Sequence, residues 1–509
     1  MQRPKVKIKK PQLKVQRPKS IKDLHPYKIF DTQIKKNIEY YGGDITDVYK
    51  TYKKSVRILI PAIIAVAILG VLKIHYLLYS VPLLALITYL YPFLYVKSKA
   101  EEHKKIVNNE APFIALIAYI DSIVDKGLNF TLKELSEIKE LKVPKIEKTY
   151  LMKMITYMNM PFSRALERRS IIHTGDMLGK LYSNYLASLE LGFTLTDRLK
   201  DTLHDLLNDL KDTYKNYIEK AGEMTEMEFA LLLLLPIILI GFSFSFKVSP
   251  IDLFAPLFSA PLLIYLVSSS QPSFDYNLKY GRYVFLLVII PVILVLPKID
   301  LTYKLIASVA VLVALSYFVY SQIKLAKDLE NNLPTLLKEI SEYLKIGYTI
   351  QTAIPKVKLS SKSVSKALEK YIKDPEHVDS PSKLFNMTFK LLFIIARTGY
   401  SSVALQELGN TIYEVVYGKN SLTRQLQLFD ILTLMTPVML WMTFTMLGKI
   451  ASTVVPPFSV IASYSVASAL IFSKISRFTL LYFPTMLMLF AILSVVAFIP
   501  PSIFNVPSY

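Results

Sequence analysis

The sequence predicts an all-α polytopic membrane protein. Hydrophobic residues make up 52% of the 509 residues and the mean hydropathy is +0.36, which is too apolar for an ordinary soluble protein. The apolar residues are gathered into long blocks of membrane-spanning length. Two long polar blocks with helical periodicity separate them. We therefore expect membrane hairpins to alternate with two helical domains outside the bilayer.

Nine apolar segments are predicted to cross the membrane, some of them close to the lower limit of about 17 residues. They are 56–72, 77–96, 229–246, 252–267, 283–297, 303–321, 429–448, 454–472 and 479–499. Segment 252–267 has the least defined bounds because Pro256 and Pro261 interrupt it. The interiors of these segments carry almost no ionisable residue, which argues against a transporter, since transporters place such groups near the middle of the membrane.

The distribution of basic residues predicts the orientation in the membrane. The short links inside the hairpins contain one lysine each and no arginine: Lys73, Lys247, Lys298 and Lys449. The N-terminal tail and both polar blocks are rich in lysine and arginine. The positive-inside rule then places the N-terminus and both polar blocks in the cytoplasm, and the C-terminus outside the cell membrane.

The predicted organisation follows from these assignments. The parts are a basic cytoplasmic N-terminal segment (1–55), a transmembrane hairpin (56–96), a first cytoplasmic helical domain (97–228), four transmembrane helices (229–321), a second cytoplasmic helical domain (322–428), three transmembrane helices (429–499) and an extracytoplasmic C-terminus (500–509). Residues 1–22 lack acidic residues and are expected to be disordered. This tail either remains solvated or docks on anionic lipid or an acidic partner.

Catalytic and cofactor motifs are not found in the sequence. There is no cysteine, which excludes disulfides and cysteine-based metal sites. The nearest match to a phosphate-binding loop, Gly175 to Leu181, is one residue too short and lacks the hydroxyl that would bind Mg²⁺. The six histidines show no metal-ligand spacing, and no nucleic-acid-binding motif accompanies the basic residues. We therefore expect no enzyme activity, no cofactor, no metal and no nucleic acid.

Each polar block contains two phrases centred on glycine. Gly127 is the glycine of the first phrase in the first block, and Gly347 is its counterpart in the second block. The second phrase begins at Gly175 in the first block, and Gly399 is its counterpart, so that the spacing between phrases is 48 residues in one block and 52 in the other. We expect the glycines to lie at helix ends or close helix contacts and to have a structural role.

These phrases resemble those of the F-type platform proteins of type II secretion and type IV pilus machines. That family carries a Gly-Glu-x-x-Gly-x-Leu phrase, which is similar to Gly175-Asp176-Met177-Leu178-Gly179-Lys180-Leu181 with Asp176 in place of glutamate. In the second block the acid and the second glycine are absent. Nine spans, with a hairpin before each domain, look like the archaeal branch that serves pili and archaella rather than the three-span bacterial form.

The resemblance implies a platform in the cytoplasmic membrane beneath a growing filament. A separate cytoplasmic hexameric secretion ATPase would drive it, pilin subunits would be extracted from the bilayer by it, and a homodimer is expected under a helical filament. The basic residues expected to contact the ATPase are Arg164, Arg168, Arg169, Lys356, Lys358 and Lys362. Two alternatives remain open, a multi-spanning transporter and a membrane scaffold unrelated to filaments.

Overall fold

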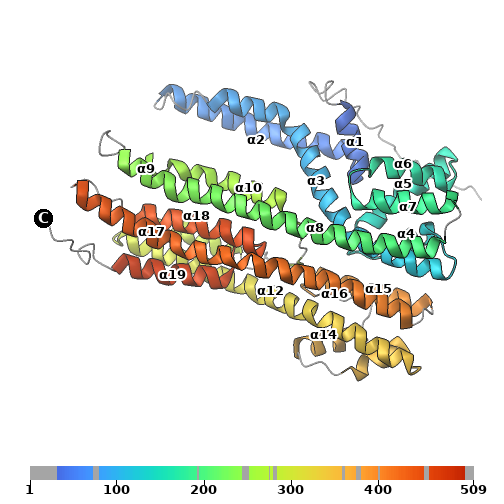
Figure 1. The fold of residues 1–509 in the computed structure, drawn as a ribbon. Coiled ribbons are helices and arrows are strands. Elements are labelled where there is room, and N and C mark those ends of the chain that lie inside the picture. Colours follow the sequence, from blue (N-terminus) through green and yellow to red (C-terminus); the bar gives the residue numbers. More distant parts are fainter. Residues whose placement is uncertain are drawn as a thin grey trace, which may run out of the picture. The chain divides into compact units, whose positions relative to one another are not determined.

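The structure is a computed structural model (Figure 1). It describes residues 31–72, 80–191, 194–242, 252–273, 276–278, 284–357, 362–373, 380–398, 402–451 and 458–498. Within these ranges the regular elements are helices, and the only extended pairing is an isolated bridge between Tyr276 and Ser382. The chain divides into two compact units. Unit 1 comprises Met1–Lys104 with Ile171–Gly175, and unit 2 comprises Lys105–Ser170 with Asp176–Tyr509.

Unit 1 is built from three helical segments. They are α1 (Asp31–Tyr41), α2 (Ile45–Leu72) and the first part of α3 (Ser80–Ile123), and a small core of Ile34, Ile38, Val48 and Val96 joins them. Asp44 precedes α2 and accepts hydrogen bonds from the backbone N–H and the hydroxyl of Thr46. These bonds lower the pKa of the Asp44 carboxyl, as is typical of a residue that caps a helix.

The first predicted span lies within α2, and residues 80–96 of the second lie within α3. Residues 73–79, which include the start of the second span, are outside the described part of the chain. On α2, Ile60, Ile64 and Ile68 form an exposed stripe at a spacing of four residues. This stripe is the outward apolar face expected of a helix in lipid.

In unit 2, the first polar region begins with the remainder of α3. It continues with α4 (Leu128–Leu135), α5 (Val143–Met158), α6 (Phe162–Ile172, which ends in unit 1), α7 (Met177–Leu191) and α8 (Leu195–Phe229). Pro144 lies in the first turn of α5, where its missing N–H costs nothing, and Asn159 ends that helix in the left-handed conformation with φ 50°. The periodic apolar side chains of α8 are buried, as their helical spacing predicts.

The second polar region follows a single long helix, α12 (Leu301–Lys345). It contains α13 (Ile350–Ala353), the 3₁₀ turn η7 (Ile354–Lys356), α14 (Lys362–Lys373), α15 (Lys383–Thr398) and α16 (Ser402–Gln425). The apolar elements are the π-helix η4 (Ala230–Leu234), α9 (Leu235–Phe242), η5 (Asp252–Ser259), α10 (Ala260–Ser270), η6 (Val284–Val288), α11 (Ile289–Val295), α17 (Gln427–Ala451), α18 (Phe458–Arg477) and α19 (Phe483–Phe498).

Five helices in the described part of the chain are long and apolar enough to cross a membrane. They are Leu195–Phe242, Leu253–Ser270, Leu301–Lys345, Ser402–Met446 and Phe458–Arg477. In the first four, at most 33% of the apolar window is buried, so most of its side chains face outward, as they do in lipid. Two shorter apolar helices, Leu286–Val295 and Phe483–Phe498, coincide with further predicted spans. The described part of the chain is thus all-α, with the helices of a multi-pass membrane protein.

Long helices connect the polar and apolar parts of unit 2. Helix α8 continues through η4 into α9, α12 runs without a break for 45 residues, and only Leu426 separates α16 from α17. In the polar part, α7 packs on α8, α8 on α16, α16 on α12 and α12 on α14 (Figure 1). In the apolar part, α18 is the most enclosed helix and packs against α8, α10, α17 and α19.

Candidate functional site at the junction of the polar regions

A buried carboxylate, Glu110 on α3, joins the two polar regions. Its oxygens accept hydrogen bonds from the N–H groups of Lys142 (3.2 Å) and Val143 (2.9 Å) at the start of α5. The ammonium group of Lys383, the first residue of α15, lies 3.4 Å away. Burial raises the pKa of the Glu110 carboxyl, and Lys383 and the two N–H groups partly offset this effect. Glu110 thereby ties the first polar region to the second.

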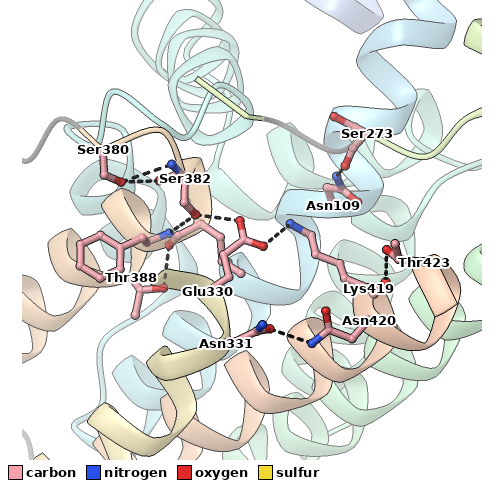
Figure 2. A network of polar contacts seen from close by, with 12 residues as sticks. Asn109, Ser273, Glu330, Asn331, Ser380, Ser382, Thr388, Lys419, Asn420 and Thr423 are labelled. Carbon is pink, nitrogen blue, oxygen red and sulfur yellow. Dashed lines mark hydrogen bonds and ion pairs between the residues drawn. The ribbon is translucent and has the colours of Figure 1, made fainter. Parts of the chain in front are cut away.

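A second buried carboxylate, Glu330 on α12, binds Ser382, which directly precedes Lys383 at the start of α15. The Ser382 hydroxyl donates to it at 2.7 Å, and Lys419 on α16 forms an ion pair with it at 3.5 Å (Figure 2). The Ser382 oxygen also accepts the N–H of Phe385, which satisfies one of the free donors in the first turn of α15. Glu330 therefore fixes α15 against α12 and α16.

The two carboxylates are 220 residues apart, the same separation as Gly127 and Gly347. They converge on the adjacent residues Ser382 and Lys383. We call Glu110, Glu330, Ser382, Lys383 and Lys419 the clasp. A cavity of about 50 Å³ lies beside it, with Glu110, Lys383 and Lys419 in its wall, and has room for a few water molecules.

Two more ion pairs link the polar regions. Lys390 lies two turns after Lys383 on α15 and binds Glu140 at 2.7 Å, with both side chains largely buried. Lys211 on α8 binds Glu414 on α16 at 2.7 Å, with both side chains more than a third exposed. Between α8 and α16 the packing is close, because a Cβ on Gly418 would lie 3.0 Å from the ring of Tyr214. The junction is both polar and tightly packed.

Where the polar regions meet the apolar helices, side chains bind the last carbonyl groups of α18. The Tyr217 hydroxyl on α8 donates to the carbonyl of Ile475 at 2.9 Å, and Gln271 donates to the Tyr217 oxygen at 3.1 Å and to the carbonyl of Lys474. On α17, Asp430 accepts two hydrogen bonds from the guanidinium of Arg477. These contacts fix the polar end of α18 to α8 and α17.

The predicted ATPase-contact residues fall into different environments. Arg164 and Arg168 are exposed and lie one turn apart on α6. Arg169 is 0% exposed: its guanidinium donates to Glu147, also 0% exposed, and lies 4.8 Å from the ring centre of Tyr150. A buried, ion-paired arginine is not available to a partner, so the structure does not support Arg169 as a contact residue. Helical periodicity places it on the inner face of α6 with Ala165 and Leu166.

The Glu147 site also holds Tyr182 of α7, whose hydroxyl donates to the carboxylate at 3.2 Å. Burial, followed by the charge of Glu147, raises the pKa of the Tyr182 hydroxyl well above its ordinary value. The Arg169, Glu147 and Tyr182 side chains thus form an internal network that joins α5, α6 and α7.

The basic residues predicted in the second polar region are partly outside the described chain. Lys356 is exposed in η7, and its ammonium group lies 4.7 Å from the ring centre of Tyr348. Lys362 begins α14, and Lys358 lies outside the described residues. Arg164 lies on α6, which the buried network joins to α5 and α7, whereas Lys356 lies in η7, which packs against α13 and α14. The two basic groups therefore belong to different polar regions.

The glycine phrases lie at helix boundaries. Gly127 precedes α4 in an extended conformation, and a Cβ there would lie 3.3 Å from the Tyr185 hydroxyl. Gly347 follows α12 with φ +98°, a conformation that favours glycine. Asp176 caps α7 by accepting the N–H groups of Leu178 (3.0 Å) and Gly179 (3.1 Å).

The remaining glycines of the two phrases are Gly175 and Gly399. Gly175 is exposed just before Asp176, and Gly399 lies outside the described residues. In the part of the chain that the structure describes, no three or more His, Cys, Asp or Glu side chains gather as a metal site.

A buried carboxyl group lies directly before the third predicted span, where the polar part of α8 meets its apolar continuation. Glu228, in the last turn of α8, is 1% exposed and hydrogen-bonds Ser468 of α18. Ser468 and its neighbour Thr436 of α17 both lie inside predicted spans. Sequence reasoning missed Glu228 because the predicted boundary between polar block and span falls directly after it.

Sequence reasoning also missed the clasp. One signal could have found it, because Glu110 and Glu330 repeat at the same 220-residue interval as the first glycines. Comparisons with protein-family models, with curated proteins and with solved structures found no match to this chain.

Proposed function

We propose that this chain is the membrane platform of an archaeal type IV pilus-like filament assembly machine. It couples a cytoplasmic hexameric secretion ATPase to the extraction of pilin subunits from the bilayer and to filament assembly. The repeated glycine phrases support this proposal through their resemblance to F-type platform proteins. In the proposal the chain works as a mechanical part and takes its energy from the separate ATPase.

The continuity of the long helices carries the proposal. A helix of 45 residues such as α12 is about 68 Å long, whereas the hydrocarbon core of a bilayer is about 30 Å thick. Each long helix can therefore cross the membrane and still extend well outside it. A force applied to the polar part of α8, α12 or α16 would move its apolar part, because an intact helix transmits displacement along its axis.

The clasp supports the same proposal. A coupling device needs its two polar regions to move together, and buried pairs such as Glu110 with Lys383 resist sliding because separation leaves an uncompensated buried charge. The additional pair of Lys390 with Glu140 holds a second point along α15. The two regions would thus pass on the ATPase motion as one body.

The proposal includes a membrane topology. The nine predicted segments cross the cell membrane with the N-terminus and both polar regions in the cytoplasm and the C-terminus outside. The basic tail lies near anionic lipid headgroups, and two copies form a homodimer beneath the filament. The similar helix order after α3 and after α12 favours a duplicated unit as the origin of this arrangement.

The ATPase-contact residues of the proposal are Arg164 and Arg168 in the first polar region, with Lys356, Lys358 and Lys362 as further candidates in the second. The test is co-purification of the secretion ATPase of the same organism with the full-length protein in lipid nanodiscs. The double charge reversal Arg164→Glu and Arg168→Glu should abolish co-purification. Lys220→Glu, at an exposed position of α8, is the matched control and should retain it. Equal ATPase binding by all three proteins would exclude α6 as the contact.

A second candidate function is favoured by one observation. Glu228 is a carboxyl group buried among apolar helices, and such groups are typical of ion or proton pathways. A transporter would show substrate flux in liposomes that Glu228→Gln abolishes, whereas a filament platform would not. A scaffold unrelated to filaments would show neither flux nor ATPase binding.

A further inference from the structure

Glu228 lies at a distinctive point of unit 2. It occupies the last turn of α8, and the π-helix η4 begins two residues later. Its side chain is 1% exposed, and one of its carboxyl oxygens, Oε2, has no hydrogen-bond partner. A buried ionised carboxylate with an unpaired oxygen is strongly unfavourable in apolar surroundings, whereas the neutral acid costs far less.

One hydroxyl group of a neighbouring helix binds this carboxyl group, and a second hydroxyl lies next to the first. The carboxyl group hydrogen-bonds Ser468 of α18, and the Ser468 hydroxyl lies 3.3 Å from the hydroxyl of Thr436 on α17. On α18, the buried hydroxyl of Ser465 lies one turn from Ser468 and also has no hydrogen-bond partner. Three helices thus bring an acid and hydroxyl groups together in an otherwise apolar bundle.

The charged groups on the elements packed against Glu228 are further along the chain. On α17 the nearest in sequence to Thr436 is Asp430, which is paired with Arg477, and on α18 the nearest to Ser468 is Lys474. Each is six residues away, or about 9 Å along its helix. On α8 itself, Glu223 and Glu226 are exposed. No cationic partner of Glu228 is seen among the described residues.

We propose that Glu228 is a proton-binding site, and that the neutral acid is the form that packs against α18. A proton fits better than a metal ion, because one carboxyl and two mutually close hydroxyls offer few ligands. The protonated carboxyl has one O–H donor and one accepting oxygen, which match hydroxyl neighbours that can either donate or accept.

The π-helix η4, which follows Glu228, links the charge of this residue to the geometry of α8. A π turn is a local irregularity of the α-helix that frequently marks functional positions. Loss of the proton would place a negative charge against α18, and a change of helical register at η4 would let α8 rotate Glu228 away from Ser468. Proton uptake at this position would therefore control the contact between α8 and α18, where the polar and apolar parts of α8 meet.

Infrared difference spectroscopy of the full-length protein in lipid nanodiscs tests the site directly. A step to alkaline pH should remove a carbonyl stretching band of a protonated carboxylic acid. Glu228→Gln should lose the Glu228 part of this signal, whereas the control Glu226→Gln, at an exposed position two residues earlier, should give the wild-type signal. A signal of wild-type size in Glu228→Gln, or no such signal in the wild-type protein, would overturn the proposal.

A second variant covers the case in which Glu228→Gln fails to fold. Ser468→Ala removes the hydroxyl partner while leaving the acid in place, so the band should remain but shift in frequency. An unshifted band would contradict the assigned contact. Neither measurement depends on filament assembly, so this proposal and the platform function can fail separately.

Discussion

The carboxylate of Glu110 on α3 and the ammonium group of Lys383 on α15 lie 3.4 Å apart, with only 4% and 20% of their side chains exposed. The chain between them contains 272 residues, including much of both polar regions. Adjacent to Lys383, Ser382 binds the other buried carboxylate, Glu330. The start of α15 therefore contacts both polar regions, through the Lys383–Glu110 ion pair and the Ser382–Glu330 hydrogen bond.

Removal of Lys383 should destabilise unit 2. Lys383→Met leaves a buried carboxylate without its cation, and we expect the free energy of unfolding to fall by about 3 kcal/mol. The loss should lie at the low end of the range for such pairs because the N–H groups of Lys142 and Val143 still bind Glu110. Thermal unfolding followed by circular dichroism in detergent gives the measurement.

The matched control for Lys383→Met is Lys211→Met, which breaks the more exposed pair with Glu414 and should cost at most about 1 kcal/mol. The double variant with Glu110→Gln should recover part of the loss, because no buried charge then remains unpaired. Equal losses from Lys383→Met and Lys211→Met would show that burial of the clasp contributes nothing.

The pH dependence of stability should reveal Glu110. Burial raises the pKa of its carboxyl above the ordinary value of 4.5, so the folded protein retains a proton that the unfolded chain releases. This contribution to stability is full below pH 4.5 and is lost as the pH rises through the raised folded-state pKa. The difference in unfolding temperature between wild type and Glu110→Gln should therefore decrease from pH 4.5 upward. A difference that is constant with pH would contradict the burial of this carboxyl.

Replacement of each of two adjacent arginines on α6 by alanine should have very different effects on stability. Arg169→Ala leaves the buried Glu147 without its cation and should destabilise the protein by about 3 to 5 kcal/mol. Arg168→Ala, at an exposed position, should change stability by less than about 0.5 kcal/mol. Unfolding of the two variants side by side makes the comparison, and similar losses from both would disprove the inner placement of Arg169.

Close packing between α8 and α16 gives a further prediction. Gly418→Val should force Tyr214 aside and lower the free energy of unfolding by about 1 to 3 kcal/mol, as overpacking does. Gly222→Ala on α8 is the control, since a Cβ there meets no atom within 4 Å. It should stabilise the helix by about 0.5 to 1 kcal/mol. A neutral Gly418→Val would mean that the two helices are not in contact there.

Local patterns in the sequence predicted part of this structure. Helical spacing predicted the buried face of α8, and composition predicted an all-α chain with long apolar helices. The same spacing could have separated Arg169 from Arg168, because Ala165, Leu166 and Arg169 share one face of α6. The prediction grouped the two arginines by charge alone. Glu228 was missed because the predicted boundary between polar block and span falls directly after it, which assigned this residue to the polar block. The pairing of Glu110 with Lys383 depends on tertiary packing, for which no local signal exists.

The platform proposal is tested most directly by filament assembly in the native host. Cells that lack this chain should produce no filaments while pilins accumulate in the membrane. The wild-type gene should restore filaments, and the variant with Arg164→Glu and Arg168→Glu should not, although it reaches the membrane in equal amount. Filaments counted by electron microscopy decide the question. Normal filament numbers in the deletion strain would contradict the proposed function.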